Sequence, residues 1–122
     1  MRPRLALVPG EPAGVGPELC VRLAQLPLPA DLVAIADPDT LAAAARALHL
    51  PLRLREPGQD CAPGELAVIE QPQAAPVEFG RAAPANARSV IDSLLRGAQG
   101  CLDHEFEGLV TGPVNKASIN AG

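Results

Sequence analysis

The sequence has no tryptophan or tyrosine, and only two phenylalanines. Proteins that bind single-stranded nucleic acid stack the bases on aromatic side chains, so such a platform cannot be assembled from these residues. An excess of basic residues is also lacking, because 10 Lys and Arg residues stand against 14 Asp and Glu residues, giving a net charge of −4. No general attraction for nucleic acid or for an anionic membrane is therefore expected.

Long apolar runs and paired cysteines are missing as well. The apolar run at residues 5–8 is ended by Pro9 and Gly10, well short of a signal-peptide core or a membrane span. The three cysteines are odd in number and widely spaced, which argues against a disulfide framework and a zinc knuckle. We therefore expect no targeting segment and a reducing, cytoplasmic location.

What is present is typical of a soluble globular protein: 122 residues, 48% of them apolar and 20% charged. This length corresponds to one domain or part of one. Apolar runs and helical spacing alternate along the chain. They predict strands at 4–8, 32–36, 52–54, 66–70 and 108–111, and helices at 16–26, 39–48 and 85–106. Such alternation indicates a three-layer α/β domain with a mostly parallel sheet.

The predicted helices carry local signals. Asp37 is suited to cap a helix that begins at Pro38. In the first helix the leucines at 19, 23 and 26 have helical spacing. In the longest helix one stripe is predicted to face the core. It consists of Val90, Ile91, Leu94, Leu95, Ala98, Cys101 and Leu102.

The loop after the first strand, "PGEPAGVGPE", resembles phosphate cradles only in its glycines. A Walker A loop needs Gly-Lys-Ser/Thr, but Pro17 and Glu18 follow Gly16. A dinucleotide fingerprint would find Leu19 at its third glycine position, and Glu18 would repel a pyrophosphate. Asp37 has the spacing of a ribose-binding acid, although helix capping suits it better. Two interpretations of the loop remain, a tight strand-to-helix turn or a ligand-facing loop.

A second loop, "TGPVNK", follows the strand at 108–111. Lys116 could pair with a phosphate or carboxylate, and Asn115 or Thr111 could hydrogen-bond a hydroxyl. Alternatively, Asn115 caps a following helix and Lys116 is solvated. Both loops follow strands of a parallel sheet, so we expect them at its carboxyl edge, where ligands of α/β proteins bind.

The remaining candidate residues favour structural roles. His49 lies at a predicted helix C-terminus before Pro51, where an imidazolium is favourable. Cys101 and His104 lie three positions apart on one helix, but two ligands without a third do not make a metal site. No metal ligands are expected in the chain.

Together, "PGEPAGVGPEL", "ADPDTL" and "GLVTGPVNKASINAG" resemble the 4-hydroxythreonine-4-phosphate dehydrogenase family of pyridoxal phosphate biosynthesis. The glycine loop is also similar to a turn of isocitrate and isopropylmalate dehydrogenases. The resemblance implies a homodimeric cytoplasmic enzyme that oxidises a small phosphorylated hydroxy amino acid with NAD or NADP. It also implies a divalent metal, Zn, Mg or Co, that polarises the substrate oxygen, followed by decarboxylation.

The resemblance also implies where the chain departs from the family. The family's His-Thr-Glu motif and its three metal-binding histidines would follow residue 122, and His49 and His104 match none of them. Residues 1–122 are therefore expected to be the N-terminal part of an α/β dehydrogenase, incomplete and inactive alone, without catalytic residues of its own. The alternatives are a non-catalytic domain that binds a phosphorylated metabolite or a partner subunit, and a relative acting on another hydroxy acid.

Two groups of site residues follow from this interpretation. The candidates for the substrate cleft are Thr111, Gly112, Asn115 and Lys116. The residues of the first loop expected to be structural or to line the cleft are Gly10, Glu11, Gly14 and Gly16.

Overall fold

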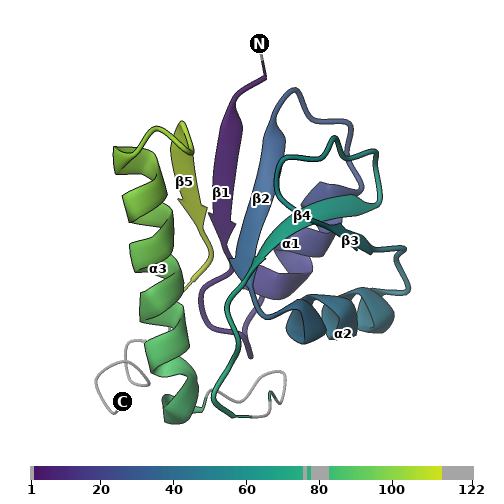
Figure 1. Ribbon diagram of the computed structural model, residues 1–122. Coiled ribbons are helices and arrows are strands. Elements are labelled where there is room, and N and C mark those ends of the chain that lie inside the picture. The colour runs from purple at the N-terminus through teal and green to yellow at the C-terminus, as the bar shows by residue number, and fades with distance from the viewer. Residues whose placement is uncertain (1, 76, 78–82, 114–122) are drawn as a thin grey trace.

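The computed structural model describes residues 2–75, 77 and 83–113, which form one five-stranded sheet with helices on both faces (Figure 1). The strand order is β3-β4-β2-β1-β5, and every paired strand is parallel to its neighbour. The elements are β1 (Arg4–Val8), α1 (Gly16–Ala24), β2 (Asp31–Ala36), α2 (Pro38–Leu48), β3 (Arg53–Arg55), β4 (Glu65–Glu70), the 3-10 turn η1 (Pro84–Asn86), α3 (Ala87–Leu102) and β5 (Gly108–Thr111).

The sheet separates two apolar cores, which confirms the predicted three-layer α/β architecture. Helices α1 and α2 cover one face, and α3 covers the other (Figure 1). The central strands β1 and β2 end in continuous buried runs, as expected for parallel strands covered on both sides. None of the helices in the described ranges is long and apolar enough to span a membrane.

Helix α2 begins and ends as its local sequence predicts. Asp37 is the N-cap, and its Oδ1 accepts a hydrogen bond from the amide of Asp39 at 2.9 Å. Pro38 follows in the first turn, where its missing N–H costs nothing. His49 ends the helix in the left-handed conformation, with φ 54°. The backbone of His49 therefore forms the C-terminal cap, a structural role.

Helix α1 is shorter than predicted, and of its three spaced leucines only Leu23 packs against the core. Leu19 and Leu26 are 48% and 52% exposed, and the helix ends at Ala24 rather than at residue 26. Cys20 and Ala24 pack on the sheet instead, and Val21 packs against α2. Small side chains allow α1 to lie close to the sheet, which leaves the larger leucines at its margin.

Helix α3 departs further from its predicted apolar stripe. Val90 is buried and Leu94 and Cys101 are partly buried, but Leu95 and Leu102 are 58% and 74% exposed. The side that meets the sheet also carries small residues that the stripe omitted: Ser89, Ser93, Gly97 and Gly100.

The close approach of α3 to the sheet explains this difference. A Cβ added at Gly97 would lie 2.7 Å from the side chain of Leu109 in β5, and one at Gly100 would overlap the ring of Phe106. The helix is therefore seated on the sheet through its smallest residues, with no space for a leucine at these positions. Hydrophobic spacing also selected Leu95 and Leu102, which lie on the outer surface.

Both ends of α3 are held by polar contacts. At its start the buried Asn86 accepts from the amide of Ala75 at 2.9 Å and donates to the carbonyl of Ala75 at 3.2 Å. Near its end Arg96 makes two hydrogen bonds to Glu105, at 2.6 and 2.8 Å, and lies over the ring of Phe106. The hydrogen bonds from Arg96 lower the pKa of the Glu105 carboxyl, because they favour its charged form.

Candidate functional site

The sheet reverses its order at β1, and this defines the carboxyl edge where a ligand would bind. From β1 the chain passes through α1 to β2 on one side, whereas β5 follows α3 and pairs on the other side (Figure 1). The loops that leave β1 and β5 therefore meet at a topological switch point, the usual ligand position in open α/β sheets. The two loops singled out in the sequence both begin here.

Glycines bring these two loops into direct backbone contact. Gly10 has φ 83°, and a Cβ there would collide with the backbone of Gly112 and Pro113. A Cβ at Gly16 or at Gly112 would overlap the carbonyl of Pro9. Gly14 is less crowded, since its nearest neighbour would be the Glu11 carbonyl oxygen at 3.3 Å. At Gly10, Gly16 and Gly112, backbone atoms fill the space that a Cβ would need, so no other residue fits there.

Hydrogen bonds join the loops at the same place. The Gly112 amide donates to the Val8 carbonyl at 2.7 Å, and the Glu11 amide donates to the Pro113 carbonyl at 2.9 Å. Within the first loop, the Gly14 amide donates to the Glu11 carbonyl at 3.0 Å. These hydrogen bonds therefore fix the direction in which the chain leaves both β1 and β5.

The carboxylate of Glu11 is buried inside the first loop. Its residue is 7% exposed, and Oε1 accepts from the Ala13 amide at 3.3 Å. A phosphate-binding loop presents free amides to its ligand. Here the amides of Glu11, Ala13 and Gly14 donate to groups of the protein. This geometry suits a tight turn with an internal anion better than a phosphate cradle.

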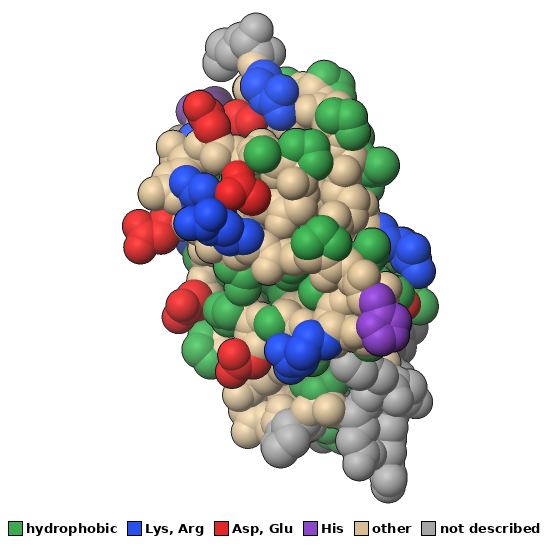
Figure 2. Space-filling view, turned by 90° about the vertical axis from the view of Figure 1, so that its right-hand side faces the viewer, with side chains coloured by type: hydrophobic (Ala, Val, Ile, Leu, Met, Phe, Trp, Pro, Cys, Tyr) green, Lys and Arg blue, Asp and Glu red, His purple; other side chains and the backbone are tan. Residues whose placement is uncertain are grey.

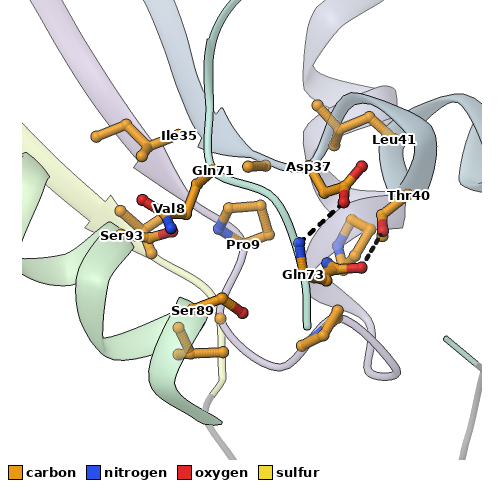
Figure 3. Close-up of a pocket in the computed structure, with 15 residues that line it drawn as sticks. Val8, Pro9, Ile35, Asp37, Thr40, Leu41, Gln71, Gln73, Ser89 and Ser93 are labelled. Atoms are coloured by element: carbon orange, nitrogen blue, oxygen red, sulfur yellow. Dashed lines mark hydrogen bonds between the residues drawn. The ribbon is translucent and has the colours of Figure 1, made fainter. Parts of the chain in front are cut away.

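A small cavity with both apolar and polar side chains in its lining lies beside the first loop, between the ends of β1, β2 and β4 (Figure 3). Its volume of about 20 Å³ is enough for roughly one water molecule. The Thr40 hydroxyl donates a hydrogen bond to the side-chain oxygen of Gln73 at 2.6 Å. The backbone amide of Gln73 donates one to the Asp37 carboxylate at 3.0 Å. Gln71 directs its side chain toward α3 (Figure 3). The polar side chains of the lining are those of Asp37, Thr40, Gln71, Gln73, Ser89 and Ser93.

Sequence reasoning missed most of this lining. Asp37 was considered only as a cap or a ribose-binding acid, and it is the cap. Gln71 carried a usable signal, because it directly follows β4 and so reaches the same sheet edge. Ser89 and Ser93 carried none, since the predicted apolar stripe placed the buried face of α3 elsewhere.

The candidate cleft residues of the second loop are only partly described. Thr111 ends β5, pairs in register with Val8 and is exposed. Gly112 is the backbone contact to the first loop. Asn115 and Lys116 lie outside the described residues, so their predicted roles remain predictions.

No metal centre forms among the residues that the structure describes. Within them, no three or more His, Cys, Asp or Glu side chains gather as ion ligands. His104, like His49, follows a helix with a positive φ, here 61°. The donor set of this part of the chain does not fit a divalent metal.

A larger cavity than the one beside the first loop lies at the opposite, amino edge of the sheet. This cavity of about 210 Å³ is bordered by the end of α1, the start of β2 and the loop before β4. Its charged groups pair with one another or with a neighbour: Arg2 contacts Asp31 at 2.8 Å, and Arg55 contacts Glu65 at 2.9 Å. Seen from the side of α2 and β3, basic and acidic side chains are interspersed on the surface (Figure 2). We therefore place the candidate site at the carboxyl edge.

A parallel sheet with helices on both faces and loops meeting at its switch point defines a doubly wound α/β protein. A family model, "Pyridoxal phosphate biosynthetic protein PdxA", matches residues 29–122. The chain therefore belongs to the PdxA family, as the sequence motifs predicted.

Individual relatives agree with this family. The 4-hydroxythreonine-4-phosphate dehydrogenase of Stenotrophomonas maltophilia (strain R551-3) is 60% identical over the whole of this chain. The chain spans 38% of the length of that relative. A crystal structure of a 4-hydroxythreonine-4-phosphate dehydrogenase from Burkholderia phymatum superposes with a TM-score of 0.89 at 20% identity, over all of this chain and 39% of that one.

A protein with a different substrate in its name has a similar fold. The terephthalate 1,2-cis-dihydrodiol dehydrogenase of Burkholderia xenovorans LB400 matches with a TM-score of 0.69 at 23% identity, over all of this chain and 37% of that one. At these identities the two crystal structures show the shared fold alone.

Proposed function

We propose that this chain forms the N-terminal part of a 4-hydroxythreonine-4-phosphate dehydrogenase in pyridoxal phosphate biosynthesis. The observation that carries the proposal is the 60% identity to the Stenotrophomonas maltophilia relative over the whole chain. In this proposal the whole protein oxidises 4-phosphohydroxy-L-threonine at its secondary alcohol, and the product then loses carbon dioxide. The three free cysteines support a place in the reducing cytoplasm.

The cofactors belong to the whole protein in this proposal. NAD or NADP would accept the hydride, and a divalent metal would stabilise the negative charge that develops on the substrate oxygen. We place the ligands of the metal outside the described residues, because these residues lack a suitable group of metal ligands. The family resemblance also extends the proposal to a homodimer.

The contribution of this chain is to build one wall of the substrate cleft. The backbone contact between the two loops fixes how the chain leaves β5. We assign Gly10, Glu11, Gly14 and Gly16 to this support. Thr111 and Gly112 lie where the wall begins, and Asn115 and Lys116 follow as candidates for contact with the substrate.

A chimera tests this proposal. Residues 1–122 replace the matching segment of the Stenotrophomonas maltophilia relative, and NADH formation from 4-phosphohydroxythreonine is followed with and without a metal chelator. We expect activity within about tenfold of the parent enzyme, loss of it with chelator, and no turnover by residues 1–122 alone. A folded chimera that is inactive beside an active parent would refute the proposal and favour a non-catalytic binding domain.

A second candidate is oxidation of a different hydroxy substrate. The terephthalate dihydrodiol dehydrogenase supports this candidate, because it has a similar fold and a different substrate in its name. The same chimera distinguishes the two, because a change of substrate preference relative to the parent would assign specificity to residues 1–122.

A further inference from the structure

The chain directly after β4 forms an extended segment, residues 71–75, which we call the strap. Burial alternates along it, because every second residue is partly buried and those between are exposed. The partly buried residues are Gln71, Gln73 and Ala75. This period of two is typical of a β-strand. The strand that pairs with β4 on this side, β2, has already ended at Ala36, so the amides of the strap need other partners.

A side chain continues the hydrogen-bond ladder of β2 and β4 beyond the end of β2. The Gln71 amide donates to the carbonyl of Ala36 at 3.0 Å. Two positions further on, the chain that left β2 has turned into α2, and the Gln73 amide donates to the Asp37 carboxylate. A carboxylate oxygen thus takes the place of a strand carbonyl. The hydrogen bond from Thr40 holds the side chain of the same glutamine.

The far end of the strap is held by Asn86, which directly precedes α3. The Asn86 side chain pairs with both the amide and the carbonyl of Ala75, at 2.9 and 3.2 Å. Asn86 is 1% exposed, so this pairing is shielded from water. The strap therefore crosses the carboxyl edge of the sheet from the start of α2 to the start of α3. Figure 3 shows Gln71 and Gln73 between these two helices.

The strap borders the first loop of the candidate site. Gln71 and Gln73 line the same cavity as Pro9 and Gly10 (Figure 3), and this cavity has room for roughly one water molecule. Little free space therefore remains between the strap and the loop. At Gly10 the loop meets the chain that leaves β5. A displaced strap would open space beside the loop, and the loop would no longer hold the exit of β5 in place.

We propose that Asp37 is a positioning residue of the substrate cleft, because it holds the strap against the first loop. The inference rests on the function proposed above, in which the cleft wall begins at Thr111 and Gly112. The two carboxylate oxygens have separate roles. Oδ1 caps α2 by accepting from the Asp39 amide, and Oδ2 accepts from the Gln73 amide. Asp37 acts through the strap and does not itself contact the substrate.

The separate roles of the two oxygens allow a selective substitution. Asp37→Asn keeps an oxygen for the cap, since asparagine caps helices as well as aspartate does. It also places an NH2 group against the Gln73 amide, so that two donors meet and this hydrogen bond is lost. Asp39→Asn is the matched control, because it removes the same charge from an exposed side chain two positions away. Both variants are made in the chimera described above, in which the rest of the enzyme is present.

Two measurements separate the holding of the strap from its effect on the cleft. Hydrogen exchange of peptides that contain residues 71–75, followed by mass spectrometry, should be about tenfold faster in Asp37→Asn. The KM for 4-phosphohydroxythreonine should rise about three- to tenfold with kcat within about twofold, because a displaced wall weakens binding of the substrate. Asp39→Asn should change neither quantity. Circular dichroism verifies that both variants are folded.

The possible results contradict different parts of the inference. Exchange of the strap that is unaffected by Asp37→Asn overturns the role of Asp37 in holding it. Faster exchange with an unchanged KM overturns the positioning of the cleft. A folded chimera without activity refutes the proposed function and the positioning role with it, whereas the exchange rates still decide whether Asp37 holds the strap.

Discussion

Single glycines determine how closely the two loops of the candidate site can meet. Gly16 and Gly112 both face the carbonyl of Pro9, and Gly10 faces the chain after β5. The requirement at Gly16 and Gly112 is for space, whereas Gly10 needs both space and a positive φ. Gly14 lies in the same loop without a positive φ, and its nearest backbone neighbour, the Glu11 carbonyl oxygen, would lie 3.3 Å from an added Cβ. This difference allows a matched pair of substitutions.

We predict that Gly16→Ala destabilises the chain by about 1–3 kcal/mol, because its methyl group would displace the Pro9 backbone. Gly14→Ala should change the free energy of unfolding by less than about 0.5 kcal/mol, since its Cβ needs only a shift of a few tenths of an ångström. Urea unfolding followed by circular dichroism measures both. Equal effects of the two substitutions would contradict the steric interpretation.

At the scale of helices and strands, the sequence predicted some features correctly and missed others. Strands β1 and β5 and the cap Asp37 were predicted correctly, because apolar runs, turn residues and capping side chains act within a few neighbouring positions. The buried face of α3 was not predicted correctly, because the spacing of apolar residues does not report the distance between helix and sheet. The cavity beside Gln71 and Ser93 was missed for a related reason, since its lining combines segments that are distant in sequence.

The end of α3 is held by the Arg96–Glu105 pair, which gives stability a dependence on pH. Arg96 lowers the pKa of Glu105 below its ordinary value of 4.5. The unfolded chain therefore takes up the proton first, and the stabilisation is complete above pH 4.5. It is lost as the pH falls through the lower pKa of the folded protein.

We predict that Glu105→Gln lowers the free energy of unfolding by up to about 1 kcal/mol at pH 7, a figure kept small because both side chains are over a third exposed. The difference from the wild type should vanish in strong acid. Asp92→Asn is the control, since its partner Arg88 is 76% exposed and the exposed pair contributes little. Denaturation over a series from pH 7 to about pH 2 measures the effect, and a difference that does not decline as the pH falls would assign it to packing.

On the scale of the molecule, the three cysteines differ in how deeply they are buried. Cys20 is buried, Cys101 is partly buried and Cys61 is exposed. Burial raises the pKa of the Cys20 thiol to about 12, so the folded protein keeps this thiol protonated where the unfolded chain would ionise. Stability should therefore decrease as the pH rises from about 9 toward 12.

We predict that a thiol reagent at pH 8 modifies Cys61 rapidly and Cys20 only through unfolding of the whole molecule. Mass spectrometry of the labelled protein over time distinguishes the sites. Cys61→Ser should remove the fast phase and leave the slow one, and added urea should accelerate the slow phase alone. Modification of Cys20 as fast as that of Cys61 would mean that the core between α1 and the sheet opens locally.

The central position of β1 has a consequence for synthesis of the chain. Its partner β5 pairs with it in register from Leu5 and Gly108, about a hundred residues apart in sequence. During translation β1 leaves the ribosome first, and one of its hydrogen-bonding edges must wait until β5 has been made. Pairing of such remote segments is slow. We therefore expect the nascent chain to assemble β1, β2 and β4 early and to depend on chaperones until β5 covers the waiting edge.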